Sequence, residues 1–250
     1  MVNSSDQPRF SLVVPVYNEG ANIAALFRTL RTQLPKPFEV LICYDFDEDN
    51  TLAAIDALSI DERLQEMRLV KNDIGRGVHN AIKAGMKAAR SPIVVVTMAD
   101  LADDYTNIEK MIELAEQGVD VVCGSRYMKG GQQLGGPWLK GNMSRFAGLS
   151  LYWLCGIPTH DATNSFKAYR KDFLDRTPIE SKAGFVLGLE LTVKAHFRNA
   201  RVAEVPAIWR DRTEGESRFN LRRWLPIYLE WYIWAFKRRL FGREKEFRQK

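Results

Sequence analysis

FSLVVPVYNE, residues 10–19, joins a mostly apolar run rich in valine to a polar end. Near-continuous runs of β-branched residues are typical of strands buried on both faces, as in parallel sheets. Residues 22–34 follow with Ile23, Phe27 and Leu30 at helical spacing, so a helix should come directly after the strand. The stretch therefore predicts the first strand and helix of an α/β sheet.

The same alternation of strand and helix continues along the chain. The predicted strands cover residues 10–17, 38–43, 67–70, 93–97, 119–123, 165–169 and 202–209. The predicted helices cover residues 22–34, 51–58, 77–89, 108–117, 138–155 and 186–197, with a glycine-rich loop at 130–137. This order predicts an α/β fold with a Rossmann-like, mostly parallel sheet and helices on both faces. We expect a disordered tail at 1–9, one domain at 10–220 and a C-terminal segment at 221–250.

The positive charge of the chain is concentrated at its C-terminal end. The net charge is +5, yet residues 221–250 alone hold nine Lys or Arg against three Glu. The rest of the chain is therefore close to neutral, which does not favour a nucleic-acid-binding surface. The polar start of the chain and its scattered cysteines lead us to expect a cytoplasmic protein.

Polar and acidic clusters follow three of the predicted strands. They are PVYNE at 15–19, YDFDEDN at 44–50 and MADLADD at 98–104. Because ligands of such sheets bind beyond the carboxyl ends of the strands, these clusters are expected to converge on one site. The alternative is that each acidic residue caps the following helix, since Asp is a favoured N-cap.

The ordered set of motifs resembles the family 2 glycosyltransferases. VVPVYNE, the acidic turn, GRG at 75–77 and ADLADD at 99–104 are followed by GSRY at 124–127 and KGG at 129–131. DATNSFKAY at 161–169 and DRTEGES at 211–217 are similar to segments of the dolichol-phosphate mannosyltransferase-like branch. The resemblance spans roughly residues 10–220.

This resemblance implies a GT-A fold and a nucleotide-sugar donor. It implies that the donor nucleotide is bound by Pro15, Tyr17, Glu19, Asp45, Asp47, Gly75, Arg76, Asp100, Arg212 and Ser217. The glycines at 75 and 77 precede a predicted helix, so their backbone N–H groups should also be available for an anion. Neither a dinucleotide fingerprint nor a P-loop is present, which argues against hydride transfer and NTPase chemistry.

The resemblance also implies a divalent cation, Mg²⁺ or Mn²⁺, bridging the diphosphate of the donor. Asp100 would be the central metal carboxylate of the DxD element, with Asp103 as a second ligand. The first Asp of that element is replaced by Met98, and a thioether is a poor ligand for a hard cation. This departure leaves open another function, that of a catalytically weakened nucleotide-sugar-binding protein.

The acceptor implied by the resemblance is a polyprenyl phosphate, and the transfer inverts the anomeric centre. Arg126, Lys140 and Ser144 would surround its phosphate, and Glu190 would face it. Cations offset the repulsion between an acceptor phosphate and a donor diphosphate, and an ionised phosphate needs no strong general base. A solvated helix face is the alternative for Lys140, and a nearby cationic partner is the alternative for Glu190.

The segment at 224–236, WLPIYLEWYIWAF, is aromatic and lies between basic residues. It is shorter than the roughly 20 residues that cross a bilayer, and its composition is typical of an interfacial helix. We therefore expect a peripheral protein on the cytoplasmic face of a membrane. A core helix or a dimer contact is the alternative for the segment, and a soluble or polysaccharide acceptor is the alternative for the enzyme.

Overall fold

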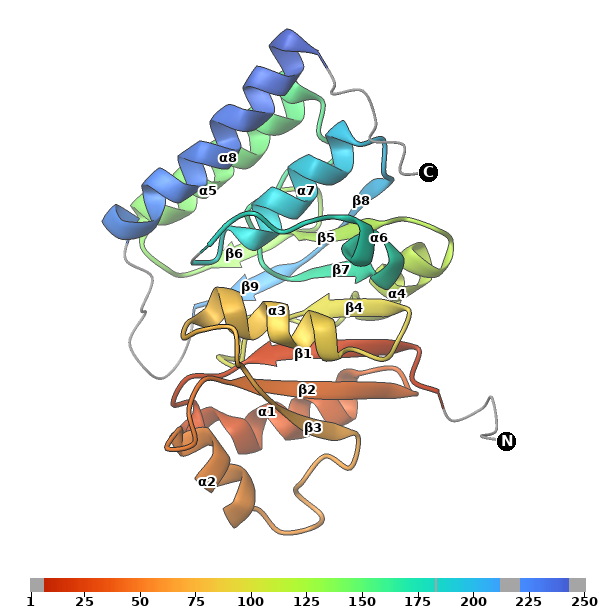
Figure 1. The fold of residues 1–250 in the computed structure, drawn as a ribbon, viewed down its shortest axis with the longest axis vertical. Helices are drawn as coiled ribbons and strands as arrows, with labels where there is room; N and C mark the ends of the chain where they lie inside the picture. Colours follow the sequence, from red (N-terminus) through yellow and green to blue (C-terminus); the bar gives the residue numbers. More distant parts are fainter. Residues whose placement is uncertain (1–6, 183, 212–220, 243–250) are drawn as a thin grey trace.

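The protein forms an α/β sheet with helices on both faces and a helical layer on one side (Figure 1). The structure is a computed structural model and describes residues 7–182, 184–211 and 221–242. The strands are β1 (Phe10–Pro15), β2 (Phe38–Tyr44), β3 (Met67–Lys71), β4 (Ile93–Val96), β5 (Val121–Ser125), β6 (Gln132–Leu134), β7 (Lys167–Arg170), β8 (Val202–Pro206) and β9 (Ile208–Arg210). The helices are α1 (Gly20–Gln33), α2 (Asn50–Ala57), α3 (Val78–Ala88), α4 (Ile108–Glu116), α5 (Trp138–Ser150), the π-helix η1 (Leu151–Cys155), α6 (Lys171–Arg176), α7 (Leu187–Phe197) and α8 (Leu221–Phe241).

The main sheet has seven strands in the order β3-β2-β1-β4-β7-β5-β8. All neighbouring strands pair in parallel except β7, which runs antiparallel to both β4 and β5. The start of β7 therefore lies at the edge where β4 and β5 end. This reversal brings the segment before β7 beside the residues that follow β4 and β5.

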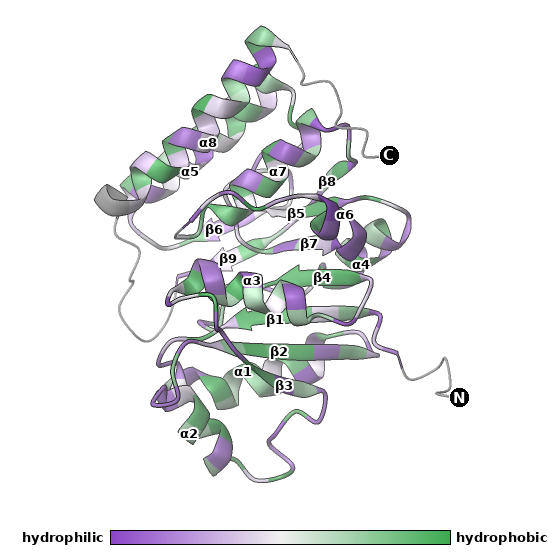
Figure 2. Ribbon diagram, viewed as in Figure 1, coloured by the Kyte–Doolittle hydropathy of each residue, from purple (hydrophilic) through white to green (hydrophobic). Residues whose placement is uncertain are grey.

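Two apolar cores cover the faces of this sheet. On one face every second residue of β1 and β4, starting from Phe10 and Ile93, packs with α1 and α4. On the other face the residues in between, such as Val13 and Val94, pack with α3 and α7. Figure 2 shows β1 and β4 as mostly hydrophobic, which agrees with strands covered on both faces. The predicted mostly parallel α/β architecture is confirmed.

Three predicted elements of the second half differ from the structure. The predicted strand at 202–209 is two strands, because β8 ends at Pro206 and β9 leaves the main sheet to pair with β6. The glycine-rich loop at 130–137 contains β6 itself. The predicted helix at 138–155 is α-helical only to Ser150 and continues as the π-helix η1. Apolar periodicity does not reveal a strand that changes partners or a change of helical pitch.

The C-terminal helix α8, which contains the aromatic segment, packs against the rest of the domain. Trp231 and Ala235 are buried in a third core with residues of η1 and α7. The Oη of Tyr232 lies 2.9 Å from the Oγ of Ser150 at the end of α5, so α5 and α8 lie side by side (Figure 1). The structure thus shows the core-helix alternative for one face of α8. Arg9, assigned to the tail, is also anchored, through Glu109 and Glu116.

Candidate active site

The loops after β1 and β2 are tied together by a carboxylate that caps a helix. Asp49 accepts a hydrogen bond from the backbone N–H of Thr51, the first turn of α2, at 2.9 Å. The same carboxylate accepts the N–H of Asn18 at 3.0 Å, and the Oγ1 of Thr51 accepts the N–H of Glu19 at 2.9 Å. For Asp49 the capping interpretation is therefore correct, although the cap also orders the loop after β1.

Asp45 holds the GRG turn instead of leaving it open. Its two oxygens accept from the Nδ2 of Asn72 and from the backbone N–H of Gly77, each at 2.7 Å. The expectation that the N–H of Gly77 is available for an anion is wrong, because a protein carboxylate already occupies it. Gly75 and Gly77 both have positive φ, which allows the turn to approach Asp45 so closely.

Three side chains contact one another beside this turn. The rings of Tyr17 and Phe46 are 5.4 Å apart in an edge arrangement, and the Arg76 guanidinium lies 5.2 Å from the Phe46 ring centre. Tyr17 is 46% exposed, so an aromatic surface is open to a ligand. Phe46 was not among the predicted site residues, because an aromatic residue within an acidic turn carries no signal of its own.

The other predicted donor residues lie around this edge. Pro15 is buried at the end of β1, and Glu19 accepts from the Nδ2 of Asn22 at 2.7 Å. Asp47 forms an exposed ion pair with Lys71. The roles predicted for these side chains remain predictions. Arg212 and Ser217 lie outside the described residues.

Two carboxylates follow β4. An oxygen of Asp103 accepts from the Oγ1 of Thr97 at 2.8 Å, and an oxygen of Asp100 accepts the N–H of Ala102 at 3.2 Å. Burial, and after it the negative charge of Asp100, raise the pKa of Asp103 to about 6. Two carboxylates that repel each other in a confined place are a favourable setting for a cation.

A cavity of about 600 Å³ extends from Asp103 into the helical layer. Its polar lining includes Asp103, Arg126, Lys140, Ser144 and Thr163. Its apolar lining comes from the helical layer and the segment before α7 and includes Phe146, Ala147, Phe185, Leu225, Leu229 and Tyr232. The cavity therefore has charged and hydroxyl groups in one continuous space with an apolar wall.

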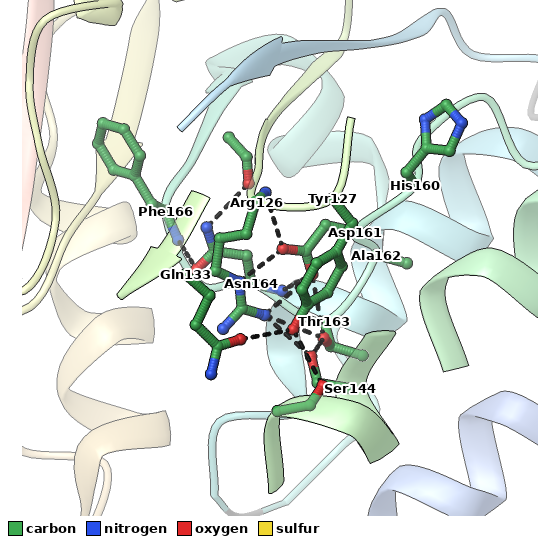
Figure 3. A network of polar contacts seen from close by, with 12 residues as sticks. Arg126, Tyr127, Gln133, Ser144, His160, Asp161, Ala162, Thr163, Asn164 and Phe166 are labelled. Atoms are coloured by element: carbon green, nitrogen blue, oxygen red, sulfur yellow. Dashed lines mark hydrogen bonds and ion pairs between the residues drawn. The ribbon is translucent and has the colours of Figure 1, made fainter. Parts of the chain in front are cut away.

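Arg126 is the centre of a polar network in this cavity (Figure 3). Its Nε donates to Asp161 at 2.7 Å, and its Nη2 donates to the other oxygen of Asp161 at 3.0 Å. The same Nη2 donates to the Oγ of Ser144 at 2.9 Å. Within the described residues no partner is found for Nη1, so this nitrogen can donate to a ligand.

The ion pair of Arg126 and Asp161 is buried, with side chains 12% and 0% exposed. Burial alone would raise the pKa of Asp161, but the Arg126 charge and its hydrogen bonds hold that pKa below its ordinary value. The ionised carboxylate in turn fixes the guanidinium plane. Arg126 is thus oriented before any ligand arrives.

Helix α5 contributes the remaining predicted acceptor residues. Lys140 and Ser144 are four residues apart and line the cavity together with Ala147, as helical spacing requires. The helix packs close to the segment before β7, because a Cβ added at Gly148 would lie 2.1 Å from the carbonyl oxygen of His160. The structure therefore brings Arg126, Lys140 and Ser144 to one cavity, as predicted.

Glu190 does not belong to this cavity. Its carboxylate is fully buried and accepts the backbone N–H groups of Glu180 and Ser181 at 2.6 and 2.9 Å. It also forms a 2.6 Å ion pair with Lys194, four residues later in α7. The assignment of Glu190 to the acceptor side is corrected, because all its contacts are to the protein interior and the alternative, a cationic partner, is what the structure shows.

Two residues of the network were missed as site residues. Asp161 and Thr163 orient Arg126 and Ser144, with the hydroxyls of Thr163 and Ser144 2.7 Å apart (Figure 3). Both belong to the DATN segment before β7, whose similarity to the family was the available signal. Their contact with Arg126 depends on the antiparallel direction of β7, which cannot be predicted from the sequence pattern.

Comparison with known proteins identifies the family. Residues 11–177 match the family described as glycosyl transferase family 2, which covers more than half of the chain. The chain is 28% identical over 242 residues to a polyprenol monophosphomannose synthase of Mycolicibacterium smegmatis, covering 90% of this chain and 87% of that protein. It is also 28% identical over 217 residues to a dolichol-phosphate mannosyltransferase of Pyrococcus furiosus, covering 85% of this chain but only 59% of that protein.

Solved structures confirm the fold. Glucosyl-3-phosphoglycerate synthase of Mycobacterium tuberculosis, in complex with Mn²⁺, UDP and glucosyl-3-phosphoglycerate, superposes with a TM-score of 0.64 at 16% identity. The superposition covers 94% of this chain and 81% of that one. The protein has the GT-A fold and belongs to glycosyl transferase family 2. It is a glycosyltransferase, and it resembles the dolichol-phosphate mannosyltransferase-like branch of the family.

Proposed function

We propose that the protein transfers a sugar from a nucleotide-sugar to a polyprenyl phosphate at a membrane surface, with inversion. The observation that carries this proposal is the cavity that Arg126 lines together with the apolar walls of α5 and α8. A phosphate on an apolar chain matches both parts of this lining. The names of the two relatives favour mannose as the sugar.

The proposed reaction is a direct displacement. A phosphate oxygen of the acceptor forms a bond to the anomeric carbon, and the bond from that carbon to the donor diphosphate breaks. The bonding electron pair leaves with the nucleoside diphosphate, so the anomeric centre is inverted. Because the acceptor phosphate is already ionised near neutral pH, no side chain needs to remove a proton. The task of Arg126 and Lys140 is to hold the anionic acceptor close to the anionic leaving group.

Asp100 and Asp103 fit a divalent cation in their chemistry. They are hard oxygen donors in one loop, and burial together with the charge of Asp100 raises the pKa of Asp103. Among the described residues no group of three or more His, Cys, Asp or Glu side chains is placed to hold a metal. The two aspartates would therefore share the cation with the donor diphosphate, whose developing negative charge it would stabilise.

Membrane association is part of the proposal. Large apolar side chains are exposed on α5 and η1, among them Phe146 at 70% and Trp153 at 75%. Leu240 and Phe241 are exposed at the end of α8, next to the basic residues 237–239. No described helix is long and apolar enough to cross a bilayer. A peripheral protein on the cytoplasmic face, with α5, η1 and the end of α8 at headgroup depth, agrees with this arrangement.

A transfer assay with purified protein tests the function. GDP-mannose and UDP-glucose are supplied in turn with Mn²⁺ or Mg²⁺ and a polyprenyl phosphate in detergent, and the labelled lipid is extracted. We expect label in the lipid phase with one donor. Label only in added soluble sugars would favour the soluble-acceptor alternative, and nucleotide binding without any transfer would favour the weakened binding protein.

Membrane docking is tested on the exposed face of η1, since removal of α8 would also expose the core around Trp231 and Ala235. The double variant Trp153→Ser/Leu154→Ser should reduce sedimentation with anionic vesicles by roughly tenfold or more, because both side chains are exposed and apolar. Ile60→Ser is the matched control, since Ile60 is 82% exposed in the loop between α2 and β3, at the other end of the molecule (Figure 1). Equal sedimentation of all three proteins would contradict docking through η1.

A further inference from the structure

Lys167 is a buried cation that the proposed reaction does not use. Its side chain is fully buried, and its Nζ donates to the backbone carbonyls of Asp161, Ala162 and Asn164. Three carbonyl acceptors match the three N–H donors of a lysine ammonium. No carboxylate of the described residues forms an ion pair with it at 4.0 Å or less. A charge buried at such cost calls for a physical reason.

The position of Lys167 in the sheet places it between the two halves of the site. It is the first residue of β7 and pairs with Val96 on one side and with Cys123 on the other. Met98 and Asp100 come shortly after Val96 in the chain, and Arg126 comes three residues after Cys123. Lys167 itself is not part of the cavity lining, whereas its neighbours Thr163 and Asn164 are.

The carbonyls that Lys167 binds belong to the turn that orients Arg126. In this turn Asp161 accepts from Arg126, from the Oγ1 of Thr163 at 3.1 Å and from the N–H of Asn164 at 3.2 Å. The backbone of α7 closes over the same place, since a Cβ added at Gly188 would lie 3.1 Å from the carbonyl oxygen of Asn164. The ammonium thus holds the inner side of a turn whose outer side presents Asp161 and Thr163.

The charges in this cluster point to a second effect of Lys167. Arg126 and Asp161 neutralise each other as a buried pair, so on their own they would offer a phosphate only dipoles. Lys167 acts on the same carboxylate: burial raises the pKa of Asp161, and the charge of Lys167 adds to the stronger effect of Arg126 in lowering it. The three buried side chains Arg126, Asp161 and Lys167 together carry one excess positive charge.

We infer that Lys167 is a positioning residue for the acceptor phosphate: it fixes the 161–164 turn and supplies the excess positive charge behind Arg126. The inference rests on the proposed function and deepens it. It implies that loss of this charge weakens recognition of the acceptor and leaves the donor nucleotide unaffected, since the donor edge at Tyr17 and Asp45 belongs to other loops.

The test compares Lys167→Gln and Lys167→Arg with a control on the same segment. Lys167→Gln can still donate to carbonyls but lacks the charge, and we expect the KM for polyprenyl phosphate to rise by roughly tenfold or more. Lys167→Arg retains the charge with a different geometry, and a smaller rise of about threefold is expected. The dissociation constant of the nucleoside diphosphate should change by less than about twofold in both, because no donor contact is altered. Lys171→Gln, a half-exposed lysine paired with Asp175, should behave as the wild type.

Several outcomes would overturn the inference. An acceptor KM within twofold of the wild type in folded Lys167→Gln would do so, as would equal losses for acceptor and donor. If thermal unfolding shows that Lys167→Gln does not fold, Lys167→Arg decides, and an unchanged acceptor KM in that variant overturns the inference. If the wild type transfers nothing to polyprenyl phosphate, the proposed function fails by itself. The variants are then compared by the thermal protection that a soluble prenyl monophosphate gives, and equal protection of wild type and Lys167→Gln overturns the inference separately.

Discussion

The proposed donor edge and the proposed acceptor cavity of this protein are built in different ways. At the donor edge short loops after β1, β2 and β3 are joined by carboxylates such as Asp45 and Asp49, and Tyr17 stays open to solvent. In the acceptor cavity Arg126 and Asp161 form a buried ion pair, and the cavity is lined by segments that are far apart in the sequence. One half consists of backbone turns with exposed side chains, and the other half is a preformed charged cluster.

The difference follows from what each half is proposed to bind. A nucleoside diphosphate is large, brings its own charges and can share a cation, so stacking and turns are sufficient for it. A single phosphate on an apolar chain offers few contacts besides its charge. A buried and fully oriented cation gives such a group the most favourable interaction, because the low local dielectric strengthens it. The comparison predicts that mutations in the two halves have separable effects.

The largest effect is expected at the boundary of the two halves. Asp100→Ala should reduce transfer by roughly a hundredfold or more, since it removes a carboxylate ligand of the proposed divalent cation, which would stabilise the leaving diphosphate. The fold should persist, because the hydrogen bond that Asp100 accepts from the N–H of Ala102 is local to its loop. Turnover at saturating donor measures the effect, and thermal unfolding checks the fold. Asp61→Ala, in the exposed loop before β3, is the control, and wild-type turnover in Asp100→Ala would remove the metal site from this account.

The next effect belongs to the acceptor half alone. Arg126→Lys should lower transfer to the acceptor by roughly tenfold to a hundredfold, because lysine cannot reproduce the two-point contact with Asp161 and still donate to a phosphate. The dissociation constant of the nucleoside diphosphate, measured by calorimetry, should be unchanged. Arg126→Ala is a poorer test, since an unpaired Asp161 in the interior would cost about 3–5 kcal/mol of the free energy of unfolding. A loss of nucleotide affinity in Arg126→Lys would contradict the separation of the halves.

The smallest effect concerns the residue that departs from the family motif. Met98 lines the cavity beside Asp103. Met98→Asp should tighten Mn²⁺ binding by about tenfold, the factor that corresponds to 1.4 kcal/mol, because it adds a hard oxygen ligand. Titration of Mn²⁺ in the presence of nucleoside diphosphate measures this, with Met143→Asp on α5 as the control. Unchanged affinity in Met98→Asp would mean that residue 98 does not face the cation.

Local patterns were sufficient to predict much of this molecule. The strands β1, β2 and β4 follow from mostly apolar runs, and Asp100 and Asp103 follow from their place after β4. The grouping of Arg126, Lys140 and Ser144 followed from resemblance to the family, and the cavity confirms that they lie together. The prediction failed for Glu190, since nothing in the local sequence indicates that its carboxylate faces the loop at 180–181.

By itself, the sequence determined which segments become strands and helices and that the strand ends carry acidic side chains, because these properties depend on neighbours a few residues away. Only the tertiary structure decided that β7 runs antiparallel between β4 and β5, and this direction brings Asp161, Thr163 and Lys167 to Arg126. It also decided that one face of α8 is core while α8 lines the acceptor cavity. The physical reason is that a buried charge is stable only where distant segments together supply its partners, and such partners have no fixed spacing in the sequence.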